Sequence, residues 1–288
     1  MRKVIKLFDP SIGNNEVRVL TRALKSHFWA SGAGTGQVGE FESEFNKYIG
    51  SDDCVAVNNG TSALHLALSL CGIKGKEVIL PSLSFVSTAH AVLYNGGIPV
   101  FVDIDPDTLC LNSQLVKKAV TNKTRVILPV HFAGMPCDLN EISQICKQYD
   151  IALIEDAAHA TGATYDNRKI GCHGMAVCFS FHPTKNLAMP TGGAVTINGK
   201  NSKKFSQILK SQRWCGITNR KGPKYDITSL GWNYYMNEFS ASIGRVQLKK
   251  IDFLNKKRRE IAKRYSKEIV LGKKIDRKST RLNSSHGY

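Results

Sequence analysis

The chain has 288 residues, of which 42% are hydrophobic and 22% charged, a composition typical of a globular protein with a sizeable core. Its 40 lysines and arginines outnumber the 23 acidic residues, so nucleic acid, a membrane surface and anionic small molecules are the partner classes to weigh. No zinc-finger or RNA-recognition signature accompanies this charge, and no stretch is apolar enough to cross a bilayer, so we expect neither a nucleic-acid nor a membrane partner.

Cysteine usage and the N-terminus bear on location. The eight cysteines are spread along the chain without a C-x-x-C pair, and several lie in apolar runs. Such cysteines are expected to be buried free thiols in a reducing compartment, not disulfides or zinc ligands. The first residues contain no apolar run long enough for a signal peptide. The sequence therefore predicts a cytoplasmic protein without a metal site.

Two helices are expected at the start of the chain, over residues 15–28 and 41–48, where apolar residues recur at helical spacing. The segment between them includes residues 29–36, which read Trp-Ala-Ser-Gly-Ala-Gly-Thr-Gly. Its small residues predict a loop that could lie close to a ligand, with Trp29 and Ala30 as candidate substrate contacts. A flexible connector anchored by Trp29 explains the same composition equally well.

From residue 54 onwards, short apolar runs follow one another, and most are separated by amphipathic segments of helical length. The runs lie at residues 54–57, 78–80, 98–102, 126–130, 151–154, 177–181 and 194–197. Alternation of this kind predicts a three-layer α/β/α domain with a mainly parallel sheet. In such domains ligands bind where the strands end.

Small polar residues follow the first of these strands, in the run Asn58-Asn-Gly-Thr-Ser-Ala63. The run opens a helix, and the backbone N–H groups and dipole at a helix N-terminus favour a phosphate. Gly60, Thr61 and Ser62 are therefore candidate phosphate contacts. An alternative with equal support is that Thr61 or Ser62 only caps the helix.

Two further strand ends lead to Phe85 and His131. Phe85 starts a helix, where its ring could stack on a planar ligand, although a lone phenylalanine more often belongs to the core. His131 is expected to be structural or to support the site indirectly, because no second metal ligand stands at a suitable spacing.

An acid pair, Glu155 and Asp156, directly follows the apolar run at residues 151–154, and His159 comes soon after it. A carboxylate at this point needs a cationic partner, and a pyridinium nitrogen is one such partner. The alternative is that the acid pair only caps a helix.

Lys185 lies on the turn after the strand expected at residues 177–181, because Pro183 ends that strand. A partly desolvated lysine can lose its proton near neutral pH and attack a carbonyl carbon. Considered alone, however, Lys185 is better interpreted as a solvated surface lysine, so its assignment depends on the other strand ends.

The C-terminal part is expected to contain a helix over residues 201–213, an irregular loop over residues 214–229, and then a long basic helix. Most of the charges on that helix are expected to form a solvated face. Residues 277–288 have no periodicity and resemble a translated sequencing adapter, so we exclude them from the fold.

Taken in order, these stretches resemble the DegT-type sugar aminotransferases, which are pyridoxal 5'-phosphate (PLP) enzymes of the aspartate-aminotransferase fold, fold type I. The matching stretches are Gly39-Glu-Phe-Glu-Ser-Glu-Phe45, Asn59-Gly-Thr-Ser-Ala-Leu64, Pro81-Ser-Leu-Ser-Phe85, Pro99-Val-Phe-Val-Asp103, Pro129-Val-His-Phe-Ala-Gly134, Glu155-Asp-Ala-Ala-His-Ala160, Phe179-Ser-Phe-His-Pro-Thr-Lys-Asn186 and Gly231-Trp-Asn-Tyr-Tyr-Met236. The agreement spans about residues 10–270, and no single motif carries it.

This resemblance implies a role for each matching position around the cofactor ring. Lys185 matches the lysine that binds PLP covalently and is a catalytic residue. Asp156 matches the partner of the pyridine nitrogen, and His159 matches a contact on the side of the ring hydroxyl. Phe85 matches the aromatic residue that stacks on the ring.

The resemblance also implies contacts to the phosphate and the substrate. Thr61, Ser62 and Ser180 match the phosphate contacts, as Gly60 does through its backbone, and His182 is a third candidate substrate contact. Asn233 matches an asparagine that reaches the cofactor phosphate of the partner subunit. A homodimer with shared active sites is therefore implied.

The implied reaction is a two-step transamination in which Lys185 moves the proton at the α-carbon of glutamate, and 2-oxoglutarate leaves. The amine then passes to a keto group of a nucleotide-linked sugar. The stretches at Glu155 and Phe179 look most like those of enzymes that act on UDP-linked 4-keto sugars for cell-surface polysaccharide or glycan biosynthesis, while GDP- and dTDP-sugars stay open. The family's dehydratases carry histidine at the position of Lys185, so this lysine favours amine transfer.

By the same resemblance, residues 1–235 form the PLP-binding large domain. Residues 236–276 form a basic linker helix and the start of a C-terminal small domain that is mostly missing. Two alternatives to the active enzyme remain. One is a PLP-binding fragment without turnover, and the other is a nucleic-acid-binding or regulatory protein that uses the basic residues 249–264.

Overall fold

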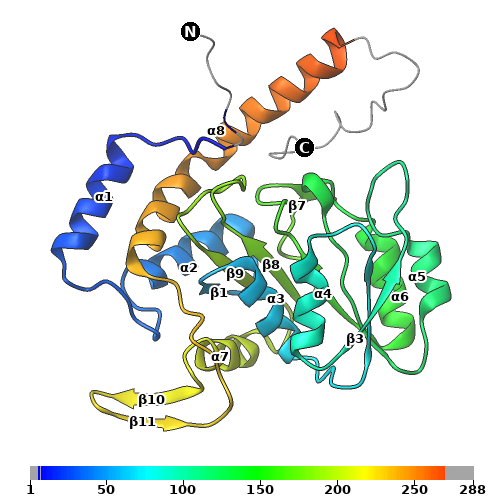
Figure 1. The fold of residues 1–288 in the computed structure, drawn as a ribbon, viewed down its shortest axis with the longest axis horizontal. Coiled ribbons are helices and arrows are strands. Elements are labelled where there is room, and N and C mark those ends of the chain that lie inside the picture. The colour runs from blue at the N-terminus through cyan, green and yellow to red at the C-terminus, as the bar shows by residue number, and fades with distance from the viewer. Residues whose placement is uncertain (1–5, 7, 270–288) are drawn as a thin grey trace.

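The computed structural model describes residue 6 and residues 8–269 (Figure 1). The expected tail at residues 277–288 lies outside the described residues, as do residues 270–276 of the expected linker segment. The described chain forms a seven-stranded sheet with helices on both faces, which confirms the expected three-layer architecture.

The central sheet has the strand order β1-β9-β8-β5-β4-β2-β3. Its strands are β1 Asp53–Val57, β2 Glu77–Pro81, β3 Ile98–Val102, β4 Thr124–Ile127, β5 Ala152–Asp156, β8 Ala176–Ser180 and β9 Gly193–Ile197. Strand β9 is antiparallel to both of its neighbours, and all other neighbouring strands are parallel. The carboxyl ends of β1, β2, β4, β5 and β8 therefore lie at one edge of the sheet.

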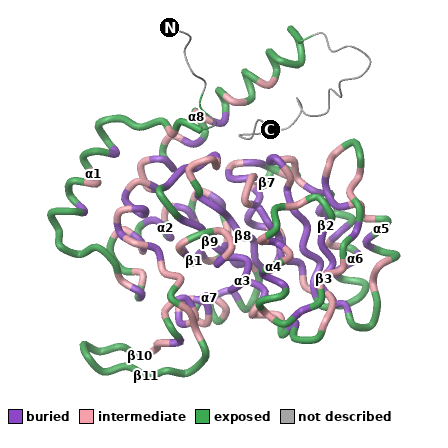
Figure 2. Tube along the Cα trace, viewed as in Figure 1, coloured by how far each residue is buried: buried purple, intermediate pink, exposed green. Residues whose placement is uncertain are grey.

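Eight helices of the described chain pack around this sheet. They are α1 Asn14–Lys25, α2 Gln37–Ile49, α3 Gly60–Ser69, α4 Val86–Tyr94, α5 Ser113–Ala119, α6 Leu139–Tyr149, α7 Ser202–Gln212 and α8 Glu238–Glu268. Helices α2, α5, α6 and α8 contribute to one hydrophobic core, and α3, α4 and α7 contribute to the other. Because both faces are covered, the strands are largely buried, except for the edge strand β3, in which Ile98 and Phe101 are exposed (Figure 2).

The two cores follow from the alternation of side chains along each strand. In β1, Cys54 and Ala56 pack into the core under α2, whereas Val55 and Val57 pack into the core under α3. A strand in this position needs apolar residues on both faces. This requirement explains why the strands appear in the sequence as uninterrupted apolar runs.

Two parts of the chain differ from the sequence-based expectation. The segment expected to be an irregular loop contains the antiparallel hairpin of β10 Ile217–Lys221 and β11 Lys224–Ile227. This hairpin projects from the body of the protein (Figure 1), and most of its residues are exposed, so it lacks the apolar pattern that predicts a strand. The short ribbon of β6 Thr164–Tyr165 and β7 Arg168–Lys169 was not expected for the same reason.

Strand β4 is also shorter than expected, because the strand expected at residues 126–130 already ends at Ile127. Pro129 and Val130 continue toward the edge of the sheet without joining the ladder, apart from an isolated bridge between Val130 and Asp156. A proline has no N–H for a ladder hydrogen bond, which accounts for the early end.

The long C-terminal helix is present as α8, which begins at its cap Asn237 and packs against α1 and α2 (Figure 1). Its first half is largely buried and its last turns are exposed (Figure 2). Among the residues that the structure describes, neither α8 nor any other helix is both long and apolar enough to cross a membrane.

A buried ion pair connects α2, β1 and the end of α7. The guanidinium of Arg213, which is 0% exposed, pairs with the Glu42 carboxylate through Nη1 and donates from the same nitrogen to the Ala56 carbonyl at 2.7 Å. The same Glu42 oxygen accepts the Ala56 N–H at 2.8 Å. The pair therefore holds α2 against the edge of the sheet that carries β1.

Replacement of Arg213 by methionine is expected to lower the free energy of unfolding by about 3–5 kcal/mol, because the Glu42 carboxylate stays buried without its guanidinium. Urea denaturation measures this change. The matched control is Arg264→Met, which breaks an exposed pair with Glu268 and is expected to cost about 1 kcal/mol or less. Equal losses in the two variants would contradict the role given to the buried pair.

Candidate functional site

A cavity of about 550 Å³ lies at the edge of the sheet where the parallel strands end. Its walls come from the residues that follow β1, β2, β4, β5 and β8. Eight of the residues predicted from the sequence line it, namely Gly60, Thr61, Phe85, Asp156, His159, Ser180, His182 and Lys185. Residues from five separate strand ends thus meet in one cavity.

Asp156 is the last residue of β5, and its side chain faces the cavity although the residue is only 5% exposed. Its Oδ2 accepts a hydrogen bond from Thr88 Oγ1 at 2.8 Å, and its Oδ1 accepts one from the Ala158 N–H at 3.0 Å. Burial raises the pKa of Asp156, while these two donors, Lys185 and His131 act in the opposite direction. A buried carboxylate of this kind favours a cation in the cavity beside it.

Lys185 lies on the turn after β8, where its backbone N–H donates to the His182 carbonyl at 2.8 Å. The side chain is partly buried and lines the cavity that Asp156 faces. Burial lowers the pKa of Lys185, and the negative charge of Asp156 partly restores it. The structure thus places Lys185 in a partly desolvated position, which differs from the solvated surface lysine suggested when the residue is considered alone.

A potential anion-binding site, here called the anion seat, lies where the start of α3 meets the end of β8 and consists of Gly60, Thr61 and Ser180. Asn59 caps α3 by accepting the Ser62 N–H, so the preceding N–H groups of Gly60 and Thr61 remain available at the positive end of the helix. The absence of a side chain at Gly60 permits this approach, because a Cβ there would lie 2.8 Å from Ser180 Cβ. The hydroxyls of Thr61 and Ser180 line the same part of the site.

Phe85 and His159 line other parts of the cavity wall. Phe85 is the cap of α4 and is 70% exposed, so its ring is available at the mouth of the cavity. His159 Nδ1 accepts the N–H of Ala133 at 3.2 Å, which leaves Nε2 as the ring nitrogen that can carry the proton. This bond connects His159 to the turn after β4.

Four predicted residues do not line this cavity. Ser62 lies in the first turn of α3, where its hydroxyl donates to Asn58 Oδ1 at 2.7 Å and its N–H donates to Asn59 Oδ1. The alternative that Thr61 or Ser62 caps the helix is wrong, because Asn59 is the cap, and Ser62 is held by these contacts and does not line the cavity.

The other three residues outside the cavity are Trp29, Ala30 and Asn233. Trp29 packs on Phe239 with ring centroids 6.0 Å apart, and Ala30 forms an isolated bridge with Asn237, so both anchor the N-terminal loop to the start of α8. Asn233 forms a bridge with Trp214 at the base of the hairpin.

Glu155 and His131 lie behind the cavity and not in it. Both are 0% exposed, and His131 Nε2 is 2.7 Å from Glu155 Oε2. His131 Nδ1 accepts the Cys137 N–H, so the proton between His131 and Glu155 is carried on Nε2 when the ring is neutral. The acid pair at the end of β5 is thus divided. Glu155 binds His131 and the Gly174 N–H, whereas Asp156 faces the cavity.

The sequence reasoning missed Thr88, which donates a hydrogen bond to Asp156 from the first turn of α4. Its position one helical turn after Ser84, at the start of the helix that follows β2, is the signal that could have indicated it. Among the described residues, no group of histidine, cysteine and acidic side chains is arranged to hold a metal ion.

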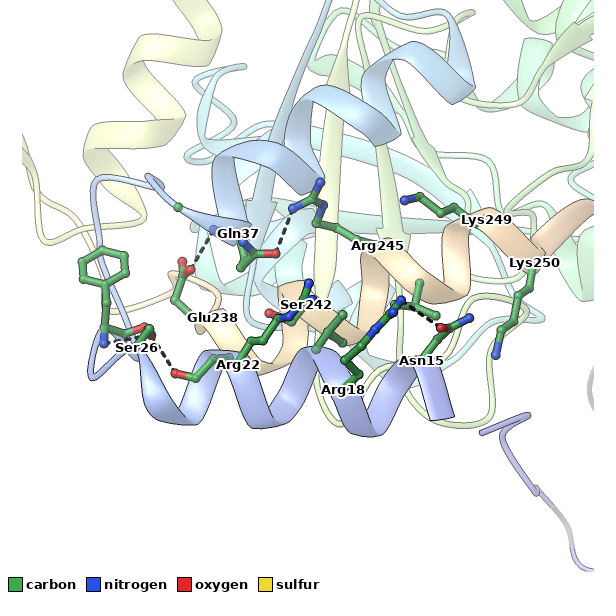
Figure 3. Close-up of a pocket in the computed structure, with 15 residues that line it drawn as sticks. Asn15, Arg18, Arg22, Ser26, Gln37, Glu238, Ser242, Arg245, Lys249 and Lys250 are labelled. Carbon is green, nitrogen blue, oxygen red and sulfur yellow. Dashed lines mark hydrogen bonds between the residues drawn. The ribbon is translucent and has the colours of Figure 1, made fainter. Parts of the chain in front are cut away.

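A second cavity, of about 620 Å³, lies between α1 and α8 (Figure 3). Arg18, Arg22, Arg245, Lys249 and Lys250 bring positive charge to its lining. Its buried carboxylate, Glu238, accepts the Gln37 N–H at 2.7 Å and so caps α2. This groove holds no acid-base pair comparable with Asp156 and Lys185, so we assign the chemistry to the first cavity.

The residues of the first cavity fit PLP. The seat at Gly60, Thr61 and Ser180 suits a phosphate, and the buried Asp156 carboxylate suits a protonated ring nitrogen. Lys185 is available on the same wall to react with the aldehyde carbon.

The sequence matches the DegT/DnrJ/EryC1/StrS aminotransferase family over residues 10–285. It is 38% identical to the spore coat polysaccharide biosynthesis protein SpsC of Bacillus subtilis over 262 residues, which are 89% of this chain and 67% of SpsC.

The fold of this chain is also similar to solved structures of aminotransferases. PseC of Helicobacter pylori, an aminotransferase involved in the biosynthesis of pseudoaminic acid, superposes with a TM-score of 0.86 at 27% identity, covering 93% of this chain and 72% of PseC. The PMP form of Spr1654 of Streptococcus pneumoniae gives a TM-score of 0.87 at 28% identity, covering 91% of this chain and 72% of Spr1654. Spr1654 has also been solved in a PLP form.

Replacement of Asp156 by asparagine is expected to lower the pKa of Lys185 further, because the carboxylate that raises it is removed. NMR titration of the protein without cofactor, labelled with ¹³C at the lysine ε-carbons, measures this pKa directly. Asp226→Asn, in the exposed hairpin, is the matched control and should leave the Lys185 titration unchanged. An unchanged pKa in Asp156→Asn would show that the two groups are not coupled.

Proposed function

Because the chain belongs to the DegT/DnrJ/EryC1/StrS aminotransferase family, we propose that it moves an amino group from glutamate to a keto group of a nucleotide-linked sugar. The sugar aminotransferases of this family are PLP-dependent transaminases. The observation that carries the proposal is the joint placement of Lys185, Asp156 and the anion seat in one cavity.

The names of two relatives support a sugar as the amine acceptor. SpsC is a spore coat polysaccharide biosynthesis protein, and PseC takes part in pseudoaminic acid biosynthesis. We therefore propose a role in the biosynthesis of a polysaccharide or another glycan. A UDP-linked 4-keto sugar is the first substrate to test, followed by GDP- and dTDP-linked sugars.

Each cavity residue is proposed to have a separate task. When bound, PLP supplies an electron sink that makes the proton at the carbon next to the substrate amine removable. The Nζ atom of Lys185 accepts this proton and then donates it again, which completes the transfer of the amine. Asp156 holds a proton on the ring nitrogen by its negative charge, and its burial strengthens this interaction because water is excluded.

The remaining residues are proposed to bind and orient. The N–H groups of Gly60 and Thr61, together with Ser180, hold the phosphate at the start of α3. Phe85 covers one face of the ring, and His159 lies at the side of the ring hydroxyl.

A homodimer is part of the proposal. Large hydrophobic side chains are exposed on the cavity wall and after the hairpin, with Phe85 at 70% and Leu230 at 79% exposure. We propose that a second subunit covers these side chains. In a dimer, Asn233 at the base of the hairpin would reach the phosphate in the partner's cavity.

We further propose that residues 1–235 act as the PLP-binding domain. Residues 236–276, whose described part is the end of the hairpin segment and α8, would serve as the linker to a second domain. The motif matches up to residue 236 support this division.

Substitution of Lys185 by alanine is expected to abolish the visible absorption band that arises from the covalent bond between PLP and Lys185. It should also slow the release of 2-oxoglutarate from glutamate by about 10³-fold, because the acid-base group is lost. The measurement is a single turnover with PLP-loaded protein, glutamate and no sugar. Lys204→Ala, an exposed lysine on α7, is the matched control.

The same experiment separates the two alternatives that involve PLP. Wild-type protein that binds PLP but releases no 2-oxoglutarate is a binding protein without turnover. Persistence of the PLP absorption band in Lys185→Ala would remove Lys185 from its proposed role.

Mixing of Lys185→Ala and Asn233→Ala subunits tests the shared site. In a mixed dimer, the cavity of the Asn233→Ala subunit has its own Lys185 and the intact Asn233 of the other subunit, so activity should exceed that of either variant alone. In the control mixture, a variant with both Lys185→Ala and Asn233→Ala replaces the Lys185→Ala subunit. No cavity of the mixed dimer then has both an intact Lys185 and an intact Asn233 from the other subunit. If the two mixtures are equally inactive, Asn233 does not act across a dimer.

A further inference from the structure

Two hydroxyl side chains form a hydrogen-bonded chain that ends on Asp156. Thr88 Oγ1 donates to Asp156 Oδ2 at 2.8 Å, and Ser84 Oγ lies 2.6 Å from Thr88 Oγ1. Thr88 is 0% exposed and does not line the cavity, whereas Ser84 does. Thr88 can therefore influence the cavity only through the groups that it contacts.

The protonation state of Asp156 determines the direction of this chain. An ionised carboxylate can only accept, so Thr88 must use its single hydroxyl proton as the donor to Asp156. Ser84 then becomes the donor to Thr88. If Asp156 were protonated, the chain could reverse, with Thr88 donating to Ser84 and Ser84 donating to the Phe85 carbonyl, which lies 3.3 Å from its Oγ.

The groups that face Asp156 show why a donor matters at this position. Burial raises the pKa of Asp156, and the cationic or titratable groups nearest to it are Lys185, His131 and the buried thiol of Cys178. His159 lines the same cavity. The direct hydrogen-bond donors are Thr88 Oγ1 and the Ala158 N–H, and only the first is a side chain that mutation can remove.

The hydrogen-bonded chain of Ser84, Thr88 and Asp156 also links two walls of the site. Ser84 and Thr88 flank Phe85, the residue that caps α4, and the Thr88 N–H donates to the Phe85 carbonyl at 3.0 Å. Asp156 belongs to β5, in the middle of the sheet. The hydroxyl pair therefore connects the segment that carries the exposed aromatic ring to the strand end that carries the carboxylate.

We propose that Thr88, oriented by Ser84, is a positioning residue that keeps the Asp156 carboxylate ionised and aimed into the cavity. This inference rests on the role proposed for Asp156 toward the ring nitrogen of PLP. Thr88 acts through Asp156 and makes no contact with the cofactor or the substrate.

The test compares two substitutions that separate the hydroxyl from the methyl group. Thr88→Val keeps the shape and removes the donor, whereas Thr88→Ser keeps the donor and removes the methyl group. A hydrogen bond to a charged group carries enough energy that Thr88→Val should weaken PLP binding by about tenfold or more. Thr88→Ser should stay close to wild type, and Ser84→Ala should fall between the two.

The second readout needs no cofactor. In protein labelled with ¹³C at the aspartate carboxyls, NMR titration should show a higher pKa for Asp156 in Thr88→Val than in wild type, and little change in Thr88→Ser. If Thr88 only fills space in the core, Thr88→Ser is the more damaging variant, because it leaves a cavity. That order, or equal effects in both variants, would overturn the proposal.

Asp156→Asn separates this inference from the function on which it rests. If Asp156→Asn does not weaken PLP binding, the role of Asp156 itself is wrong. If Asp156→Asn weakens binding and Thr88→Val does not, only the positioning role of Thr88 fails. Neither result depends on finding the sugar substrate.

Discussion

The burial of Asp156 and Lys185 in one cavity is the constraint on which the rest of the site depends. Each group alone would favour its neutral form in this setting, because burial raises the pKa of the carboxyl and lowers that of the amine. Their opposite charges act against both shifts. Thr88 and the Ala158 N–H supply the further stabilisation that a buried carboxylate needs.

The start of α3, which forms the anion seat, reaches this charged pair because the backbone at Asn59 passes close to that at Gly193. Strand β9 lies between β1 and β8, so the turn after β1 must pass the start of β9 to reach the end of β8. Gly193, the first residue of β9, permits this path, since a Cβ there would lie 2.4 Å from the Asn59 carbonyl oxygen. Gly60 then lies directly against Ser180. Two glycines in different elements therefore decide whether the helix N-terminus can face the cavity.

Part of the positive charge in the C-terminal part of the chain has a structural explanation. Arg245 pairs with Glu44 on α2, Lys250 pairs with Glu16 on α1, and the last turns of α8 contain a further pair between Arg264 and Glu268. Cations on α8 thus hold the N-terminal helices against the body of the protein. This arrangement, together with the family match, favours the enzyme over a protein that uses this helix to bind nucleic acid.

The sequence by itself determined the alternation of strands and helices and the placement of Lys185, Gly60 and Asp156 just after or at strand ends, because apolar runs and turn residues are local properties. The tertiary structure decided which side chains face the cavity. Asp156 faces it and Glu155 does not, since neighbouring residues of a strand point to opposite faces. The role of Thr88 and the hairpin at residues 217–227 also appear only in the fold. Thr88 acts on Asp156, which is distant in the sequence, and the hairpin consists of exposed strands without an apolar pattern.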